Sequence, residues 1–202
     1  MNAAKKPAAK KKPNAAYHHG ELHLALRDAA LAILEKDGLG ELSLRAVARK
    51  AGVSHAAPYR HYPNHEALLV ELASEGFQEL RKDIAAAAAT PNHKVDRITD
   101  IGGAYMRFAA RKPALAKLMF GPQIPNRDKH PELSEAAEAI GVEIGAALND
   151  QALGLAVWSA VHGLAMLTLD NVIDLGQRRS GLNALPSRAE ILLRSLFASK
   201  ID

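Results

Sequence analysis

The sequence of 202 residues contains no cysteine. This excludes a disulfide framework, a thiolate zinc site, an iron–sulfur cluster and a cysteine nucleophile. Aromatic residues make up only 4% of the chain, and alanine and leucine supply most of its 48% of apolar residues. Because alanine and leucine favour helices over strands, this composition predicts an all-α protein.

Long apolar runs are absent as well. No stretch reaches the roughly 18 uninterrupted apolar residues that indicate a transmembrane helix, so we expect no membrane partner. Residues 1–16 have no apolar core of the kind that a signal peptide needs. They also contain no arginine and are interrupted by prolines, unlike a mitochondrial transit peptide. We therefore expect a cytoplasmic protein of one or two domains.

Positive charge is concentrated near the N-terminus. Residues 1–65 contain 11 lysines and arginines against 5 aspartates and glutamates, a net charge of +6, whereas residues 66–202 contain 15 against 17, a net charge of −2. Six of the nine histidines also lie in the first 65 residues. This asymmetry indicates a head that binds a polyanion such as nucleic acid. The alternative is a solvated lysine tail, because five of these lysines lie in residues 1–16, which we interpret as a disordered basic arm.

Apolar residues follow a helical period along most of the chain. Ser43, Ser54 and Asn64 are suited to cap the second, third and fourth helices, and Gly38 and Gly52 are suited to end the first and second. The predicted helices span residues 19–38, 44–51, 54–62, 65–89, 93–111, 113–120, 131–148, 150–175 and 187–199. The pattern thus predicts about nine helices and no strand, with an N-terminal three-helix unit joined to a C-terminal helical bundle.

Residues 42–69, LSLRAVARKAGVSHAAPYRHYPNHEALL, have the features of a helix-turn-helix. Two helices that cross closely need a small residue at the crossing, which Ala48 supplies, and a turn that tolerates a positive φ, which Gly52 supplies. The second helix then presents small and polar side chains that suit a DNA groove. Pro58 lies inside this helix and removes a backbone hydrogen bond, so we expect the helix to be short or distorted. The alternative is an ordinary helical hairpin.

This segment resembles the DNA-binding domain of the TetR/AcrR family of bacterial repressors. The residues that carry the resemblance are Gly38, Ser43, Val47-Ala48, Ala51-Gly52-Val53-Ser54, Tyr59-Arg60-His61-Tyr62 and Leu68-Leu69. The resemblance implies a helix-turn-helix domain over residues 17–65 and a ligand-binding and dimerisation domain over residues 66–202. It also implies a homodimer that binds a palindromic double-stranded DNA operator, needs no cofactor, and is released by a small apolar or amphipathic effector.

By the same resemblance, one group of side chains contacts DNA. These residues are Ser43, Arg45, Ser54, His55, Ala56, Ala57, Tyr59, Arg60, His61, Tyr62 and His65. Tyr62 stands where the family usually has phenylalanine, so its hydroxyl needs a partner. His65 stands where the family usually has a lysine that contacts a phosphate, and histidine is mostly neutral above about pH 7.

The C-terminal half carries a shorter signature. Trp158, His162 and Gly163 resemble the W-x3-H-G pattern that names one TetR subgroup, and Trp158 and His162 share a helical face. They are candidates to line a ligand pocket; the alternative is a buried tryptophan beside a histidine that is hydrogen-bonded in the core. The full set of pocket candidates is Tyr105, Phe108, Met119, Phe120, Trp158, His162 and Met166.

The helices predicted at 150–175 and 187–199 are too apolar for one small domain to bury entirely, which predicts a partner chain over them. In the TetR family these two helices form a four-helix bundle with those of a second copy. Gly154 and Gly163 would permit close approach, and burial within the monomer is the alternative. The residues expected at this dimer interface are Ala160, Leu164, Leu192 and Leu196.

No enzyme signature is present, because the sequence lacks a nucleophile elbow, a P-loop, a dinucleotide fingerprint and an HExxH motif. His19 and His23 lie one helical turn apart, but no acidic or cysteine partner accompanies them, so we expect no metal site. The expected function is that of a DNA-binding transcriptional regulator and not of an enzyme. A helical small-molecule-binding protein without a DNA role is the alternative, and it would leave the N-terminal motif unexplained.

Overall fold

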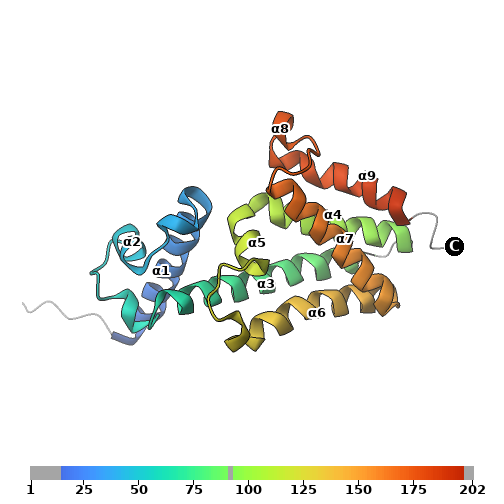
Figure 1. Ribbon diagram of the computed structural model, residues 1–202. Coiled ribbons are helices and arrows are strands. Elements are labelled where there is room, and N and C mark those ends of the chain that lie inside the picture. Colours follow the sequence, from blue (N-terminus) through green and yellow to red (C-terminus); the bar gives the residue numbers. More distant parts are fainter. Residues whose placement is uncertain (1–14, 91–92, 198–202) are drawn as a thin grey trace, which may run out of the picture.

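The computed structural model describes residues 15–90 and 93–197, with side chains from Gly20 onward. Over these ranges the chain forms nine α-helices, four short 3-10 helices and no strand, so the predicted all-α fold is confirmed. The predicted basic arm lies, except for its last two residues, outside the described residues. Figure 1 shows an N-terminal head beside a larger C-terminal bundle.

The head is built from α1 (Ala15–Asp37), α2 (Leu44–Lys50) and the first turns of α3 (His65–Ala88). Aliphatic side chains recur at helical spacing on these helices, and the face that they form is the one that is buried. The buried residues include Leu26, Ala30, Ile33, Leu34, Leu44, Val47, Leu68 and Leu69.

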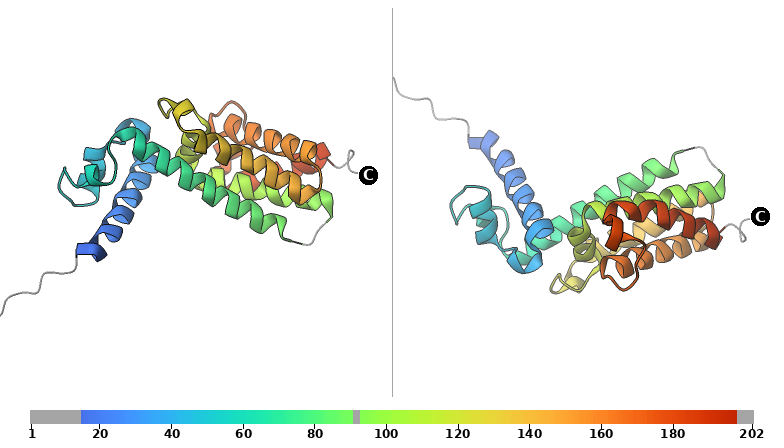
Figure 2. Two further views of the ribbon diagram at one scale, coloured as in Figure 1. Left: turned by 90° about the horizontal axis from the view of Figure 1, so that it is seen from below. Right: turned by 90° about the horizontal axis from the view of Figure 1, so that it is seen from above.

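Helix α3 joins the head to the bundle. Figures 1 and 2 show it leaving the head and running along the bundle, where it packs against α4 (Lys94–Arg111), α5 (Pro113–Phe120) and α6 (Pro131–Leu148). Leu68 is fully buried at the head end of α3, and Ile84 is only 1% exposed near its far end. Because one continuous helix belongs to both cores, a tilt of α3 within the bundle also moves the head.

Glycines allow two close helix crossings in the bundle. A Cβ atom at Gly154 of α7 (Gln151–Leu169) would lie 2.3 Å from the Cα atom of Gly145 in α6. A Cβ atom at Gly102 of α4 would lie 2.1 Å from Cδ1 of Leu193 in α9 (Leu185–Phe197). Gly154 therefore serves a contact within the chain, and the expectation that it opens a path for a dimer partner is corrected.

Most helix boundaries agree with the sequence prediction to within two residues, and three of the predicted helices do not. The α-helix predicted at 54–62 is replaced by turns and a 3-10 helix, Pro58–Arg60. Helix α1 begins at Ala15 instead of His19. Helix α7 ends at Leu169 instead of residue 175, because Asn171 adopts a φ of 58°. The N–H group of Val172 then bonds the carbonyl oxygen of Leu167 at 2.9 Å, which closes the helix, and the short α8 (Gln177–Ser180) follows.

Helix α7 has the length and composition of a membrane span, with a mean hydropathy of 1.7, and it is the one such helix among the described residues. One third of it is buried, and it packs against α4 and α6 as a bundle helix does. Its outward side carries exposed leucines, among them Leu155 at 55% and Leu167 at 44% exposure.

Candidate DNA-binding face and ligand cavities

The first half of the predicted helix-turn-helix is present in the head. The Ser43 hydroxyl accepts the N–H of Ala46 at 3.1 Å and so caps α2, as the sequence predicts. Gly52 follows α2 with a φ of 70°, the left-handed conformation that its position requires. The N–H of Val53 then bonds the carbonyl oxygen of Ala48 at 3.0 Å, so the chain reverses directly after the helix.

The second half departs from the prediction. Instead of an α-helix capped by Ser54, the chain forms turns followed by a 3-10 helix, Pro58–Arg60, without a side-chain cap. Pro58 has no N–H to donate to the Ser54 carbonyl oxygen, which instead accepts the N–H of Ala57 at 3.0 Å. The predicted α-helical form and the Ser54 cap are thus wrong, whereas the predicted distortion at Pro58 is confirmed.

Most of the side chains that we expect at DNA lie on the surface of the head. Ser43, Arg45, Ser54, His55, Ala56, Tyr59 and Arg60 are exposed, and Ala57, His61 and His65 are half-buried. Tyr59 is 52% exposed, so its ring is available to a partner. The exposed group comes from the N-terminal part of α2 and from the segment around the 3-10 helix, so it spans both halves of the motif.

Tyr62 lies in the core of the head and not on its surface. It is 1% exposed, and its hydroxyl donates to Oε1 of Glu71 at 2.9 Å. Nε2 of His23 is 3.0 Å from the same carboxylate oxygen, and the imidazole ring of His23 stacks on the ring of Tyr62 with 5.6 Å between the ring centroids. Burial raises the pKa of Tyr62, so the hydroxyl stays a donor. Tyr62, which the resemblance places at DNA, therefore links α1 to α3 instead, and we leave it out of the DNA-binding face.

His65 is the first residue of α3, after the predicted cap Asn64, whose side chain accepts the N–H of Ala67 at 2.8 Å. Nε2 of His65 is buried and has no hydrogen-bond partner among the described residues. A phosphate would therefore meet Nδ1 of this ring, and the predicted phosphate contact stays a prediction.

In the bundle, aromatic pocket candidates gather around Phe120. Its ring centroid lies 4.4 Å from that of His162, and 6.5 Å from those of Trp158 and Tyr105. Tyr105, Phe108 and Met119 are at most 1% exposed and belong to the core. Among the seven candidates, Phe120, His162 and Met166 line a cavity.

Among the described residues, His162 has a hydrogen-bond partner at one ring nitrogen only. The hydroxyl of Tyr105 lies 2.7 Å from Nδ1 of His162 and has no other acceptor among the described residues, so it donates to this nitrogen. Burial lowers the pKa of His162 and raises that of Tyr105, which keeps both groups neutral at neutral pH. A neutral imidazole that accepts at Nδ1 carries its proton on Nε2. The core interpretation of His162 therefore holds for Nδ1, while Nε2–H remains a donor on a residue that lines a cavity.

Two cavities of about 240 Å³ each lie beside α5. The bundle cavity, between α5 and α7, is lined by Lys117, Phe120, Gly121, Pro122, Gln123, His162, Met166 and Asp170. The junction cavity, between the head and α5, is lined by Leu34, Gly38, Leu39, Ala114, Lys117, Leu118 and Gln123. Lys117 and Gln123 line both, so the two cavities are neighbours that share these side chains.

Sequence reasoning missed Lys117, although a lone cation inside the apolar segment PALAKLMF was a usable signal. Its Nζ lies 2.8 Å from Oδ1 of Asp170 and donates to the carbonyl oxygen of Leu169 at 3.0 Å. Lys117 thus connects α5 to the C-terminal end of α7 and lines both cavities.

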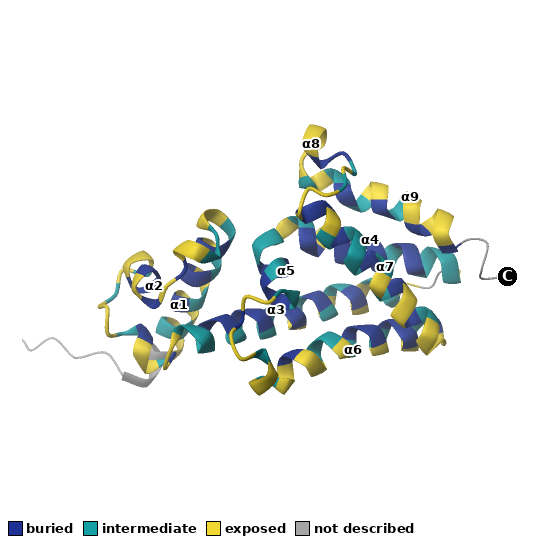
Figure 3. Ribbon diagram, viewed as in Figure 1, coloured by how far each residue is buried: buried dark blue, intermediate teal, exposed yellow. Residues whose placement is uncertain are grey.

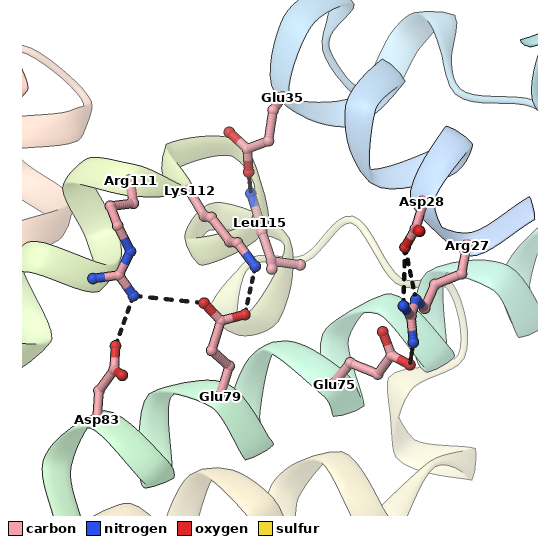
Figure 4. Close-up of polar contacts among 9 residues, drawn as sticks. All are labelled: Arg27, Asp28, Glu35, Glu75, Glu79, Asp83, Arg111, Lys112 and Leu115. Atoms are coloured by element: carbon pink, nitrogen blue, oxygen red, sulfur yellow. Dashed lines mark hydrogen bonds and ion pairs between the residues drawn. The ribbon is translucent and has the colours of Figure 1, made fainter. Parts of the chain in front are cut away.

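Polar contacts attach α5 and α4 to the head and to α3 (Figure 4). The carboxylate of Glu35, in α1, accepts the N–H of Leu115 at 2.8 Å and that of Ala114 at 3.1 Å, and so caps the N-terminus of α5. Burial raises the pKa of Glu35. At the end of α4, Arg111 donates to Asp83 at 2.7 Å, and Lys112 pairs with Glu79. Glu35 therefore holds α5 directly against the head.

The predicted dimer residues divide into two groups. Ala160 and Leu164 are half-buried and pack against the core of their own chain. Leu192 and Leu196 of α9 are 45% and 49% exposed, and Figure 3 shows exposed residues along the side of α9 that faces away from the bundle. Three further exposed apolar side chains on α7 and α9, which the sequence did not single out, are Leu155, Leu167 and Ile191. A Cβ atom at Gly163 would meet nothing within 4 Å, in contrast to Gly154.

Known proteins match both parts of the chain. The model of "Bacterial regulatory proteins, tetR family" matches residues 26–72, and that of "Tetracyclin repressor-like, C-terminal domain" matches residues 98–181. The HTH-type transcriptional repressor KstR of Mycolicibacterium smegmatis is 32% identical over 92 residues, which are 46% of this chain and 45% of KstR. The HTH-type transcriptional regulator BetI of Rhizobium meliloti is 33% identical over 88 residues, which are 42% of this chain and 43% of BetI. The chain thus matches less than half the length of these curated relatives.

The fold is also shared over nearly the whole chain. The structure of a protein with unknown function from Rhodococcus sp. RHA1 has a TM-score of 0.65 and 28% identity, and the match covers 90% of this chain and 98% of that one. The two family models together cover more than half of this chain, including α2, the turn at Gly52 and the start of α3. The predicted resemblance is confirmed: the chain belongs to the TetR family of bacterial transcriptional regulators.

Proposed function

We propose that this protein is a DNA-binding transcriptional repressor that a small apolar or amphipathic ligand releases from its operator. The proposal rests above all on the head, where a capped α2, the turn at Gly52 and an exposed run of small, polar and basic side chains follow one another. Arg45 and Arg60 are suited to phosphates or guanine, and Ala56 is suited to a thymine methyl group. Repression is the role named for the relative KstR.

A second copy of the chain is part of the proposal. Leu155 and Leu167 of α7 and Ile191, Leu192 and Leu196 of α9 expose apolar surface that a like face would bury. Two heads related by a twofold axis would then bind two half-sites of a palindromic operator, as dimeric helix-turn-helix proteins do. A cytoplasmic location follows from this role.

Release by a ligand needs a path from a cavity to the head. A ligand shifts DNA binding only if it prefers one arrangement of the heads over another. Helix α5 borders both cavities, and its N-terminus is capped by Glu35 of the head. Occupation of a cavity beside α5 would therefore act on α1 through this cap and on α3 through packing.

Selection from a random double-stranded DNA library tests the DNA-binding role. We expect enrichment of an inverted repeat, and fluorescence anisotropy should then give a higher affinity for the selected sequence than for a shuffled one. Arg60→Ala should weaken binding to both sequences, whereas His55→Ala should reduce the difference between them. Lys82→Ala, at an exposed position in the bundle part of α3, serves as the matched control. A wild-type protein that enriches no sequence and binds both DNAs equally would contradict the proposal.

A further inference from the structure

The two cavities beside α5 are each too small for a typical ligand. Pockets that hold drug-sized molecules measure roughly 300–1,000 Å³, whereas the junction cavity and the bundle cavity measure about 240 Å³ each. They share the lining side chains of Lys117 and Gln123, and their two volumes taken together reach the typical range. A site that spans both is elongated, because one cavity lies against the head and the other against α7.

The chemistry of the lining differs from one end to the other. At the head end, Leu34, Leu39 and Leu118 line the junction cavity, which has no charged lining residue except Lys117. At the α7 end, the ammonium group of Lys117 and the Nε2–H of His162 supply two donors, and Asp170 supplies one carboxylate. Asp170 lines only the bundle cavity, and its side chain is 55% exposed, so it can turn outward and leave Lys117 to another anion.

We propose that the joined cavities bind one elongated amphipathic anion, such as a long-chain carboxylate. Its carboxylate group replaces Asp170 at Lys117 and accepts the Nε2–H of His162. Its apolar chain passes Gln123 and ends between α5 and the head, against Leu34 and Leu39. Binding at this site does not depend on the proposed function; only its effect on DNA binding rests on it. The apolar chain of the ligand, seated between α5 and the head, would separate the two surfaces that Glu35 joins.

Laurate is the probe, with dodecan-1-ol as the uncharged molecule of the same length and butyrate as the short anion. Binding to the full-length protein is measured without DNA, by isothermal titration calorimetry and by the fluorescence of Trp158, the single tryptophan. We expect laurate to bind more tightly than either comparison molecule. Lys117→Met should weaken laurate at least about tenfold and leave dodecan-1-ol unchanged, since it removes the charge but keeps an apolar stem.

Two further variants act in opposite directions. Asp170→Asn should tighten laurate binding by roughly two- to fivefold, because it removes an exposed competitor for Lys117. Leu39→Asp should weaken the binding of laurate, because it places a negative charge where the apolar end of laurate would lie. Lys82→Met, outside both cavities, is the control, and circular dichroism checks that each variant is folded.

The outcomes separate the site from its consequence. Equal binding of laurate and butyrate, or no effect of Lys117→Met, would overturn the proposal. No effect of Leu39→Asp would overturn the part of it that places the chain against the head. Laurate that binds as expected but does not lower the affinity for a selected operator would leave the site standing and contradict the proposed release by this ligand class.

Discussion

Glu35 allows a quantitative test of how the head is attached to the bundle. Glu35→Ala would leave the N–H groups of Leu115 and Ala114, now bonded at 2.8 and 3.1 Å, without their partner at the N-terminus of α5. Loss of an N-terminal cap typically costs ~0.5–2 kcal/mol, and because two donors lose their acceptor we expect the upper end, about 2 kcal/mol. In chains of this size each kcal/mol lowers Tm by roughly 2–4 °C, so we expect a fall of roughly 4–8 °C.

Thermal unfolding followed by circular dichroism measures this change. Glu35→Gln keeps one acceptor oxygen and should fall between the wild type and Glu35→Ala. Glu41→Ala is the matched control, because Glu41 is an exposed glutamate in the 3-10 helix that follows α1. A Tm for Glu35→Ala within about one degree of the Glu41→Ala value would refute the reasoning, since it would mean that water replaces the carboxylate without loss.

The same carboxyl group predicts a dependence on pH. Burial raises the pKa of Glu35, so the folded state binds this proton more tightly than the unfolded state does. The part of its contribution that depends on this proton is then complete below the unfolded value of about 4.3 and is lost as the pH rises through the raised folded value. The free energy of unfolding of the wild type relative to Glu35→Gln, from urea titrations, should therefore decrease from about pH 4 to about pH 7. An increase over this range would show that the two N–H bonds outweigh the burial of the charge.

Three further predictions concern the bundle and its link to the start of α3. Leu196→Glu places a charge on the exposed apolar face of α9, so the variant should be a monomer by light scattering and should no longer bind an inverted repeat. A variant that remains a dimer would place the interface elsewhere. Gly154→Ala should lower the free energy of unfolding by ~1–3 kcal/mol, because its Cβ would lie 2.3 Å from Gly145. Gly163→Ala is the control: its Cβ would meet nothing within 4 Å, so in a monomeric background such as Leu196→Glu it should not destabilise the fold. Equal losses for the two variants in urea titrations would contradict this. The Glu66 carboxylate, whose Oε1 lies 2.9 Å from Nε2 of His130, raises the pKa of His130. The stabilisation by this pair should therefore be full below about pH 6.5 and disappear as the pH rises through the raised value. A stability difference between wild type and His130→Gln that stays constant from about pH 6 to about pH 9 would exclude this.

Much of the head follows from the sequence, because the interactions involved are local. Ser43 and Asn64 cap α2 and α3 by accepting N–H groups three residues ahead, and such a bond depends only on the nearby backbone. Gly52 adopts a positive φ where the pattern requires one. Pro58 distorts the segment that it occupies, because the missing N–H belongs to that residue itself.

The tertiary structure alone decided which of the predicted side chains are available for function. Tyr62 has the right position in the motif, but Glu71 and His23 place it in the core. Lys117 acquires its place between two cavities from α7 and from the head, which are distant in sequence. The cap of α5 comes from Glu35, 79 and 80 residues before the N–H groups that it accepts. A contact across such a separation depends on how α1, α3 and α5 pack as bodies, and no local period or spacing encodes that arrangement.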